Sequence, residues 1–378
     1  MPSINMQQCF VRNEQLKHYP KVSIDSIPSK FQLIISSTSN IYGKCLSVFI
    51  MFLLNLVHCH ALLYISLDSI FSIEIGKLVS LLLRNWMFII FYLNYNQNLC
   101  KQIDDHWNGL QIDYDYETRK YFSTQKAIYR WLTYILYILP YMMRYCYSFY
   151  MDNDDNKSNL SSAVDFKQNI ILYFLLTICA PITFFVHFCR SCILSDLAML
   201  AQTAVQFNLV TLKKLLKESR KDEKSLNINA IKNIRHKYLL SCRLVDKLNE
   251  IMSPSSFLLF IYFLANACHL SYSLLYTEQN QSDKWYNIIL TSSLLITNLV
   301  YTHAMIKIHE KSKESLAIVY RLSLKTNSMR LLNEISLFLK HKEIGFSFGG
   351  IFMLTTSSLS TLYSIFITII LALPSFVS

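Results

Sequence analysis

The sequence contains little charge, little glycine and little proline. Only 16% of its 378 residues are charged, and the chain holds 6 Gly and 7 Pro. Soluble domains carry about 25% charged residues, so the composition is not that of an ordinary cytosolic enzyme. Disordered and fibrous chains are rich in glycine and proline, so these classes do not fit either. The chain is instead 52% hydrophobic, with 24 Tyr and 24 Phe, which predicts an all-α polytopic membrane protein.

Motifs that carry catalysis or bind metals are also missing. We find no His-Glu-x-x-His and no glycine-rich phosphate loop. Cys189 and Cys192 have a Cys-x-x-Cys spacing, but no second pair or downstream histidines complete a zinc site. On a helix these two thiols share one face. We therefore expect no enzyme activity, no metal and no cofactor. The polar N-terminus lacks the pattern of a signal peptide and is expected to stay in the cytosol.

Long apolar runs predict seven transmembrane helices. A bilayer core requires about 20 predominantly apolar residues per helix. Pro254 is expected in the first turn of the fifth span, a favoured position for proline. Seven windows satisfy the length requirement: 41–65, 71–96, 128–150, 168–192, 254–276, 285–305 and 348–374.

The distribution of Lys and Arg predicts the orientation. With the N-terminus inside, 30 of the 36 Lys and Arg residues fall in inner segments and 4 in outer segments. The net charge of +11 is therefore a topology signal rather than a sign of nucleic-acid binding. All three Asn-x-Ser acceptors, Asn156, Asn159 and Asn280, fall in segments assigned outside, where glycosylation occurs. We predict a cytosolic N-terminus and an extracellular C-terminus.

The long inner segments predict helices that extend the spans into the cytosol. Residues 193–253 and 306–342 carry apolar residues at helical spacing, with charged residues opposite them. These faces either pack within the subunit, lie on the lipid surface or form an assembly domain. The predicted organisation is a cytosolic N-terminal segment, 1–40; spans one to four, 41–192; anchor helices, 193–253; spans five and six, 254–305; anchor helices, 306–347; and the last span, 348–378.

Polar residues in the outward halves of the spans predict a ligand pocket. Charged groups in a bilayer usually face a cavity or a partner, and aromatic rings with a few donors suit a small-molecule pocket. An interfacial aromatic belt is the alternative explanation. The candidates are Arg84, Tyr141, Arg144, Tyr145, Tyr173, His269, Tyr272 and Trp285.

The last span differs from the others. Gly345, Gly349 and Gly350 lie at its entrance, and its second half is aliphatic with sparse hydroxyl residues. Such a helix suits a water-filled pore with hydrophobic constrictions. It equally suits an ordinary span whose hydroxyl groups bond their own backbone.

The C-terminal quarter resembles the insect gustatory receptor family. The run from Ile308-His309-Glu310 through Gly345–Phe352 to the end follows that family's cytosolic helix, glycine-phenylalanine entrance and last span. The family hallmark is Thr-Tyr, five apolar residues, then Gln-Phe. Here Thr368 and Phe376 match the hallmark, whereas Ile369 and Ser375 replace its Tyr and Gln. The resemblance implies that these two replacements lie at the constriction of the pore.

The resemblance implies a ligand-gated, non-selective cation channel of four subunits in the plasma membrane of sensory neurons. Its expected partners are a small tastant, bitter or otherwise not a sugar, membrane lipids, and further copies or other gustatory receptors in a homotetramer or heterotetramer. The implied pore and gate residues are Thr368, Ile369, Ala372, Ser375 and Phe376. An insect odorant receptor-type subunit is the nearest alternative. A G-protein-coupled receptor is a more distant one, because the chain lacks that class's motifs in the third and seventh helices.

Overall fold

The computed structural model describes residues 97–112, 115–155, 180–219, 227–276 and 281–377, together with positions 42, 45, 49, 82, 83, 86, 87, 90 and 91. The elements in these ranges are α5 (Gln97–Leu110), α6 (Tyr116–Asp155), α8 (Ala180–Ser219), α9 (Ile228–Tyr276), α10 (Gln281–Ser323), α11 (Met329–Leu339), β1 (Ser347–Phe348), β2 (Phe352–Met353) and α12 (Thr356–Val377). The all-α prediction is confirmed, apart from one two-stranded hairpin.

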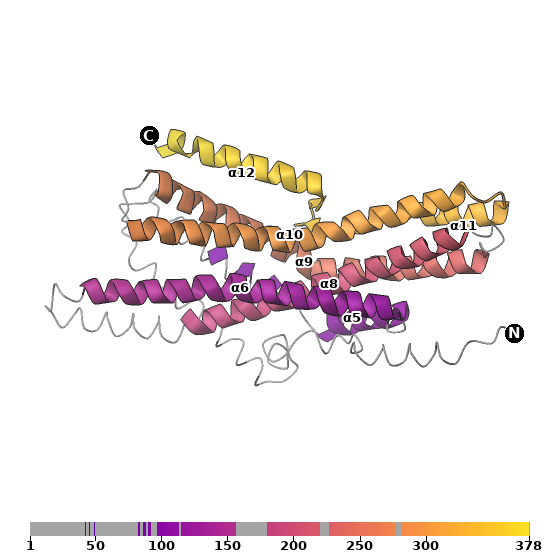
Figure 1. Cartoon of the computed structure of the whole chain (residues 1–378), viewed down its shortest axis with the longest axis horizontal. Coiled ribbons are helices and arrows are strands. Elements are labelled where there is room, and N and C mark those ends of the chain that lie inside the picture. The colour runs from indigo at the N-terminus through magenta and orange to yellow at the C-terminus, as the bar shows by residue number, and fades with distance from the viewer. Residues whose placement is uncertain are drawn as a thin grey trace.

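Five of the predicted spans correspond to long helices. The third, fifth and sixth windows fall on α6, α9 and α10. The fourth falls on α8 from residue 180 onward, and its residues 168–179 lie outside the described residues. The seventh predicted a span from residue 348, but residues 348–353 belong to the hairpin and α12 begins at Thr356. The windows 41–65 and 71–96 lie almost entirely outside the described residues. Within the described part, His187–Ser219, Ile228–Ser271 and Asn287–Ser323 are long and apolar enough to cross a membrane. In α8, α9 and α10 the helix continues without a break from the predicted span into the predicted inner segment (Figure 1).

Side-chain caps start several of these helices. Asp115 precedes α6, and its carboxylate accepts a hydrogen bond from the Thr118 backbone N–H at 3.3 Å. At α12 the cap is reciprocal. The Thr355 hydroxyl accepts from the Ser358 N–H at 3.1 Å, and the Ser358 hydroxyl accepts from the Thr355 N–H at 2.7 Å. Polar residues with no evident role in the sequence therefore set the helix boundaries.

Pro254 does not begin a helix, so that prediction is wrong. It lies inside α9, which runs through it. The proline ring removes one backbone donor, so the Glu250 carbonyl four residues earlier loses its partner within the helix. Membrane helices tolerate such a proline, and α9 continues through it in contact with α8, α10 and α12.

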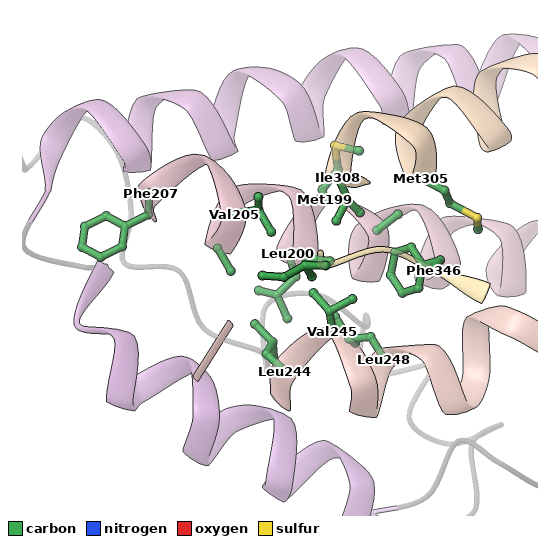
Figure 2. Packing of buried hydrophobic residues seen from close by; sticks show 14 of the residues in the cluster. Met199, Leu200, Val205, Phe207, Leu244, Val245, Leu248, Met305, Ile308 and Phe346 are labelled. Atoms are coloured by element: carbon green, nitrogen blue, oxygen red, sulfur yellow. The ribbon is translucent and has the colours of Figure 1, made fainter. Parts of the chain in front are cut away.

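Helix α8 is the centre of the molecule. Every residue from Cys189 to Val205 is buried, and α6, α9 and α10 all contact this helix. Cys189 and Cys192 are both buried on it, as expected for thiols that act as small apolar groups. Figure 2 shows Leu200 and Val205 of α8 beside Val245 of α9 and Ile308 of α10. The inner halves of the long helices therefore share one hydrophobic core.

The apolar faces of the inner segments pack within the chain. Leu331, Ile335 and Phe338 of α11 are buried, and α11 contacts α9 and α10. Tyr238 of α9 is fully buried and lies 5.1 Å from Phe338, ring centroid to centroid. Of the three alternatives left open by the sequence, packing within the subunit accounts for these positions.

Candidate functional site

A short hairpin connects the inner helices to α12. Strands β1 and β2 pair antiparallel, with Phe348 opposite Phe352. Gly349 and Gly350 form the turn with φ of 61° and 75°, a left-handed conformation that favours glycine. A Cβ atom on Gly349 would also lie 3.0 Å from the Phe257 ring. The glycine cluster noted in the sequence is therefore a turn packed against α9.

Hydrogen bonds fasten this hairpin to α9. The Asn249 side chain donates to the Ser347 hydroxyl at 2.8 Å and accepts from the Ser347 backbone N–H at 2.9 Å. The Ser253 hydroxyl accepts from the Gly350 N–H at 2.9 Å and lies 3.0 Å from the Ser347 hydroxyl. We call Asn249, Ser253, Ser347 and Gly350 the hairpin clamp. It fixes the position at which the chain enters α12.

Aromatic rings continue the connection from the hairpin to α12. Phe348 is 3% exposed, and its ring meets Phe257 and Phe260 edge-on, with centroids 5.5 and 5.4 Å away. Phe260 in turn meets Tyr363 of α12 at 6.3 Å. Hairpin, α9 and α12 therefore form one packed unit whose aromatic rings are in direct contact.

The two faces of α12 differ. Leu359, Leu362, Tyr363 and Phe366 pack against the core, whereas the opposite face is exposed. That exposed face carries four hydroxyl residues, spaced four, three and four residues apart, and Leu371, which is 74% exposed. We call this set the hydroxyl stripe: Ser357, Thr361, Ser364 and Thr368. Within it, Thr361 and Thr368 donate to the Ser357 and Ser364 carbonyls at 3.1 and 2.9 Å.

The segment between α11 and β1, which leads into the hairpin, is held in the core by polar contacts. The Ser312 hydroxyl of α10 lies 2.9 Å from the Tyr238 hydroxyl and accepts from the Ile344 N–H at 2.7 Å. His341 lies beside the rings of Tyr238 and Phe338. Burial there, and then the positive charge of Arg235, lower the pKa of the His341 imidazole below its ordinary value. These contacts hold the segment between α11 and β1 against α9 and α10.

A buried ion pair joins α6 to α8. The Arg130 guanidinium contacts both carboxylate oxygens of Asp196, with Nη2–Oδ2 at 2.7 Å and Nε–Oδ1 at 3.3 Å. The Asp196 side chain is 1% exposed and that of Arg130 is 34% exposed. Such two-point contacts are strong because both partners are charged and their geometry matches.

A small cavity lies among the four long helices. Its volume is about 20 Å³, and space for one water requires roughly 10–15 Å³ on the same measure. Arg190 of α8 lines it and is 4% exposed. From the sequence alone, Arg190 is only one of the 30 inner Lys and Arg residues. The lining residues are Thr133, Leu136, Arg190, Ser191, Leu194, Ser255, Leu259, Thr297, Val300 and Tyr301.

Comparison with known proteins agrees with this architecture. The family model described as 7tm Chemosensory receptor matches residues 98–373. The chain belongs to the 7tm chemosensory receptor family. The resemblance drawn from the last quarter of the sequence is thereby confirmed at the level of this family. No curated protein matches the chain in sequence.

Two solved structures are similar to this receptor in fold. The insect olfactory receptor OR5 of Machilis hrabei in complex with eugenol gives a TM-score of 0.69 at 11% identity, over 98% of both chains. A second structure of the same olfactory receptor gives a TM-score of 0.61 at 12% identity, over 97% of both chains. At these identities the likeness concerns the fold.

The predicted pore residues of this chemosensory receptor lie on α12. Thr368 is exposed, Ile369 and Ala372 are half-buried, and the side chains of Ser375 and Phe376 lie outside the described residues. Thr361, Ser364 and Leu371 are not among the predicted pore residues. Their alternating spacing of three and four residues, which continues to Ser375, is the signal that could have found them.

The predicted ligand-pocket residues are described only in part. Arg84 and Tyr173 lie outside the described residues, and the side chains of Tyr141, Arg144, Tyr145 and Tyr272 are likewise not described, although these four lie on α6 and α9. His269 is half-buried on α9, and Trp285 of α10 is 57% exposed. The outward pocket therefore stays a prediction. The glycosylation acceptors Asn156, Asn159 and Asn280 also lie outside the described residues.

One sequence match was overlooked. Gly345-Phe346-Ser347-Phe348-Gly349 has the Gly-x-Ser-x-Gly pattern of a hydrolase nucleophile. That motif acts on a sharp turn from a strand into a helix, with a histidine beside the serine. Here Ser347 lies in a hairpin strand, and its hydroxyl contacts Asn249 and Ser253. The match therefore belongs to the hairpin clamp.

Proposed function

We propose that this chain is a gustatory receptor subunit of a ligand-gated, non-selective cation channel. It detects small tastants, bitter or otherwise not sugars, at the plasma membrane of sensory neurons. The observation that carries the proposal is the hydroxyl stripe on the exposed face of α12. A ring of such helices presents hydroxyl groups to water, and Leu371 adds an apolar step of the kind that gates pores by dewetting.

The opposing explanation is an ordinary span whose hydroxyl groups bond their own backbone. Thr361 and Thr368 do make such bonds, so bonding alone does not distinguish the two. Exposure of the stripe to water distinguishes a pore from an ordinary span. In a pore Ser364 faces an aqueous path, whereas in an ordinary span it faces lipid. The half-buried Leu362 packs against the core in both cases.

Cysteine accessibility separates these explanations. The variants Ser364→Cys and Leu362→Cys are expressed in cultured cells, and whole-cell current is recorded before and after a charged, membrane-impermeant thiol reagent. Eugenol and a panel of soluble bitter compounds serve as probes. We expect the reagent to change the current of Ser364→Cys and to leave that of Leu362→Cys unchanged. Equal responses in the two variants would argue against a pore along the stripe.

Assembly is proposed to be a homotetramer or a heterotetramer with other gustatory receptors. The experiment is single-particle imaging of the purified chain. A fourfold particle with α12 on its axis is the expected result for the homomer, and a monodisperse monomer would exclude it. Ser375 stands where the family hallmark has Gln, and its smaller side chain closes a constriction less fully. We therefore expect a leak current from the chain expressed alone, reduced in Ser375→Gln, or else dependence on a partner subunit.

The ligand is proposed to occupy the outward halves of the spans, near Arg144, Tyr145 and His269. The similar olfactory receptor OR5 forms a complex with eugenol, which supports a small organic molecule here. The experiment is a concentration–response series for each active probe, repeated with Arg144→Gln. A shift in the half-maximal concentration is expected for Arg144→Gln. The same substitution at Arg321, which is exposed at the far end of α10, serves as the control.

The proposed membrane topology has the N-terminus and the helices of 193–253 and 306–347 in the cytosol. Spans occupy 41–192 and 254–305, and within the unit 348–378 the helix α12 forms the last span. Use of Asn156, Asn159 or Asn280 by the glycosylation machinery is the test. Endoglycosidase treatment of the expressed chain is expected to increase its gel mobility, and the triple Asn→Gln variant is expected to lose that shift.

An odorant receptor-type subunit is the second candidate. The observation that favours it is that both similar structures are of an olfactory receptor. Recording with volatile probes, with and without a co-expressed odorant co-receptor, distinguishes the two. Currents that require the co-receptor and respond to volatiles alone would replace the gustatory assignment.

A further inference from the structure

The cavity that contains Arg190 lies at one level of the helix bundle. Thr133, Ser255 and Tyr301 stand near the inner ends of the third, fifth and sixth predicted spans, and Arg190 stands near the inner end of the fourth. The cavity is thus separate from the predicted ligand pocket, which occupies the outward halves of the spans. A site here is independent of the proposed channel function.

Arg190 is a buried charge without a described counter-charge. It is 4% exposed, and its Nε and Nη1 atoms have no hydrogen-bond partner among the described residues. None of the described residues that line the cavity is acidic. The carboxylate of Asp196 is already held at both oxygens by Arg130.

An arginine cannot relieve this burial by losing its proton, because its guanidinium remains charged in proteins. A buried charge requires a partner of opposite sign or a set of acceptors. The described part of the structure provides neither to Nε and Nη1. The group that satisfies them therefore lies beyond these residues.

A second donor points to the same cavity. The Ser255 hydroxyl of α9 is buried, with the residue 2% exposed, and it has no hydrogen-bond partner among the described residues. In contrast, the Thr133 and Thr297 hydroxyls donate to the Tyr129 and Ser293 carbonyls, both at 2.8 Å. Arg190 and Ser255 therefore bring uncommitted hydrogen atoms from two helices to one cavity.

We infer that this cavity binds a small monovalent anion, a halide ion, held by the Arg190 guanidinium and the Ser255 hydroxyl. A volume of about 20 Å³ holds an ion of about the size of a water molecule and is too small for a phosphate headgroup with its ester substituents. An anion in this position neutralises Arg190 and links α8 to α9.

The test is the anion dependence of thermal stability of the full chain, purified in detergent. The apparent Tm is measured in potassium isethionate, whose anion is too large for the cavity. The isethionate is then replaced stepwise by chloride, bromide or acetate at constant ionic strength. We expect a saturable rise in Tm, because a ligand that binds only the folded state stabilises it. A rise with chloride and bromide that acetate does not produce is the expected result. An equal rise with acetate, which is larger than the cavity, would show that the anion acts elsewhere on the protein.

Variants assign the effect to the cavity. Arg190→Gln is expected to abolish the anion-dependent rise, and Ser255→Ala is expected to raise the half-saturating concentration roughly tenfold, as for loss of one hydrogen bond to a charged group. Arg243→Gln, which removes an exposed positive charge from α9, is expected to keep the wild-type response. If Arg190→Gln cannot be isolated folded, Ser255→Ala decides the question.

Two further results would overturn the inference. One is a Tm that does not depend on chloride or bromide at constant ionic strength. The other is an anion response that persists unchanged in Arg190→Gln and Ser255→Ala, because the anion would then act elsewhere on the protein.

Discussion

Substitution of Asn249 by alanine tests whether the hairpin clamp determines the connection to α12. Asn249 makes two hydrogen bonds to Ser347, one as donor at 2.8 Å and one as acceptor at 2.9 Å. In Asn249→Ala both are lost, and the Ser347 backbone N–H has no replacement acceptor from that side chain. The Ser347 hydroxyl retains its contact with Ser253 at 3.0 Å. The hairpin is therefore loosened at β1 but not released.

The expected size of the effect follows from these bonds. A hydrogen bond contributes about 0.5–1.5 kcal/mol, and a buried donor left unsatisfied costs about 1–3 kcal/mol, so the loss is roughly 2–4 kcal/mol in total. An unfolding entropy of about 2.1 cal/mol/K per residue gives roughly 0.8 kcal/mol/K for the whole chain, which converts this loss into a decrease in Tm of roughly 3–5 °C. Asn249→Asp keeps the acceptor and loses the donor, so about half of that decrease is expected.

Two assays measure the consequences. The apparent Tm of the purified protein follows the stability, and whole-cell recording follows the current at rest and with the bitter panel. If α9 acts on α12 through the clamp, Asn249→Ala also changes the ratio of evoked to resting current. Asn233→Ala is the matched control, because Asn233 is exposed on the same helix. A Tm equal to that of the control, together with an unchanged current ratio, would refute the assignment of the clamp.

Three further substitutions test the packing. Asp196→Asn leaves the charge of Arg130 without its counter-ion, and we expect a loss of roughly 2 kcal/mol, measured as a lower Tm. Phe348→Ala removes a ring that is 3% exposed, and we expect a loss of roughly 3–5 kcal/mol. Because burial lowers the pKa of His341 in the folded chain, this imidazole binds a proton at a higher pH in the unfolded chain than in the folded one. The contribution of the neutral His341 imidazole to stability is therefore fully present above about pH 6.5 and is lost as the pH falls through the folded pKa. We expect His341→Gln to reduce the decrease in Tm between about pH 7.5 and 5.5.

Each of these predictions has a control and a contradicting result. For Asp196→Asn, the double variant Arg130→Met with Asp196→Leu is expected to recover part of the loss, since it removes both charges; no recovery would contradict a role for the pair. Phe348→Leu is expected to lose less than half as much stability as Phe348→Ala loses. For the histidine, the exposed His236 supplies the control His236→Gln. Identical pH profiles for the two glutamine variants would exclude His341 as the acid-sensitive group.

The sequence could predict the helices because lipid imposes a strict length and composition on a spanning segment. Three windows of apolar residues lie within α6, α9 and α10 and two more overlap α8 and α12, and the last quarter was sufficient to indicate the family. Pro254 was placed wrongly, because sequence alone does not show whether a helix begins at a proline or, packed against neighbouring helices, continues through it. The alternating spacing of the hydroxyl stripe was visible in the sequence, but which face of α12 is exposed was not.

The sequence by itself determined the membrane class, the positions of the long helices and the resemblance to chemosensory receptors, because hydrophobic length and charge asymmetry are local properties of the chain. The tertiary structure decided which polar residues act together. Asn249 and Ser347 are 98 residues apart, and Arg130 and Asp196 are 66 residues apart. Arg190 and Ser255 come to line one cavity only when α8 and α9 pack. Hydrogen bonds and ion pairs depend on distances of a few ångströms, and only the folded chain brings such residues that close.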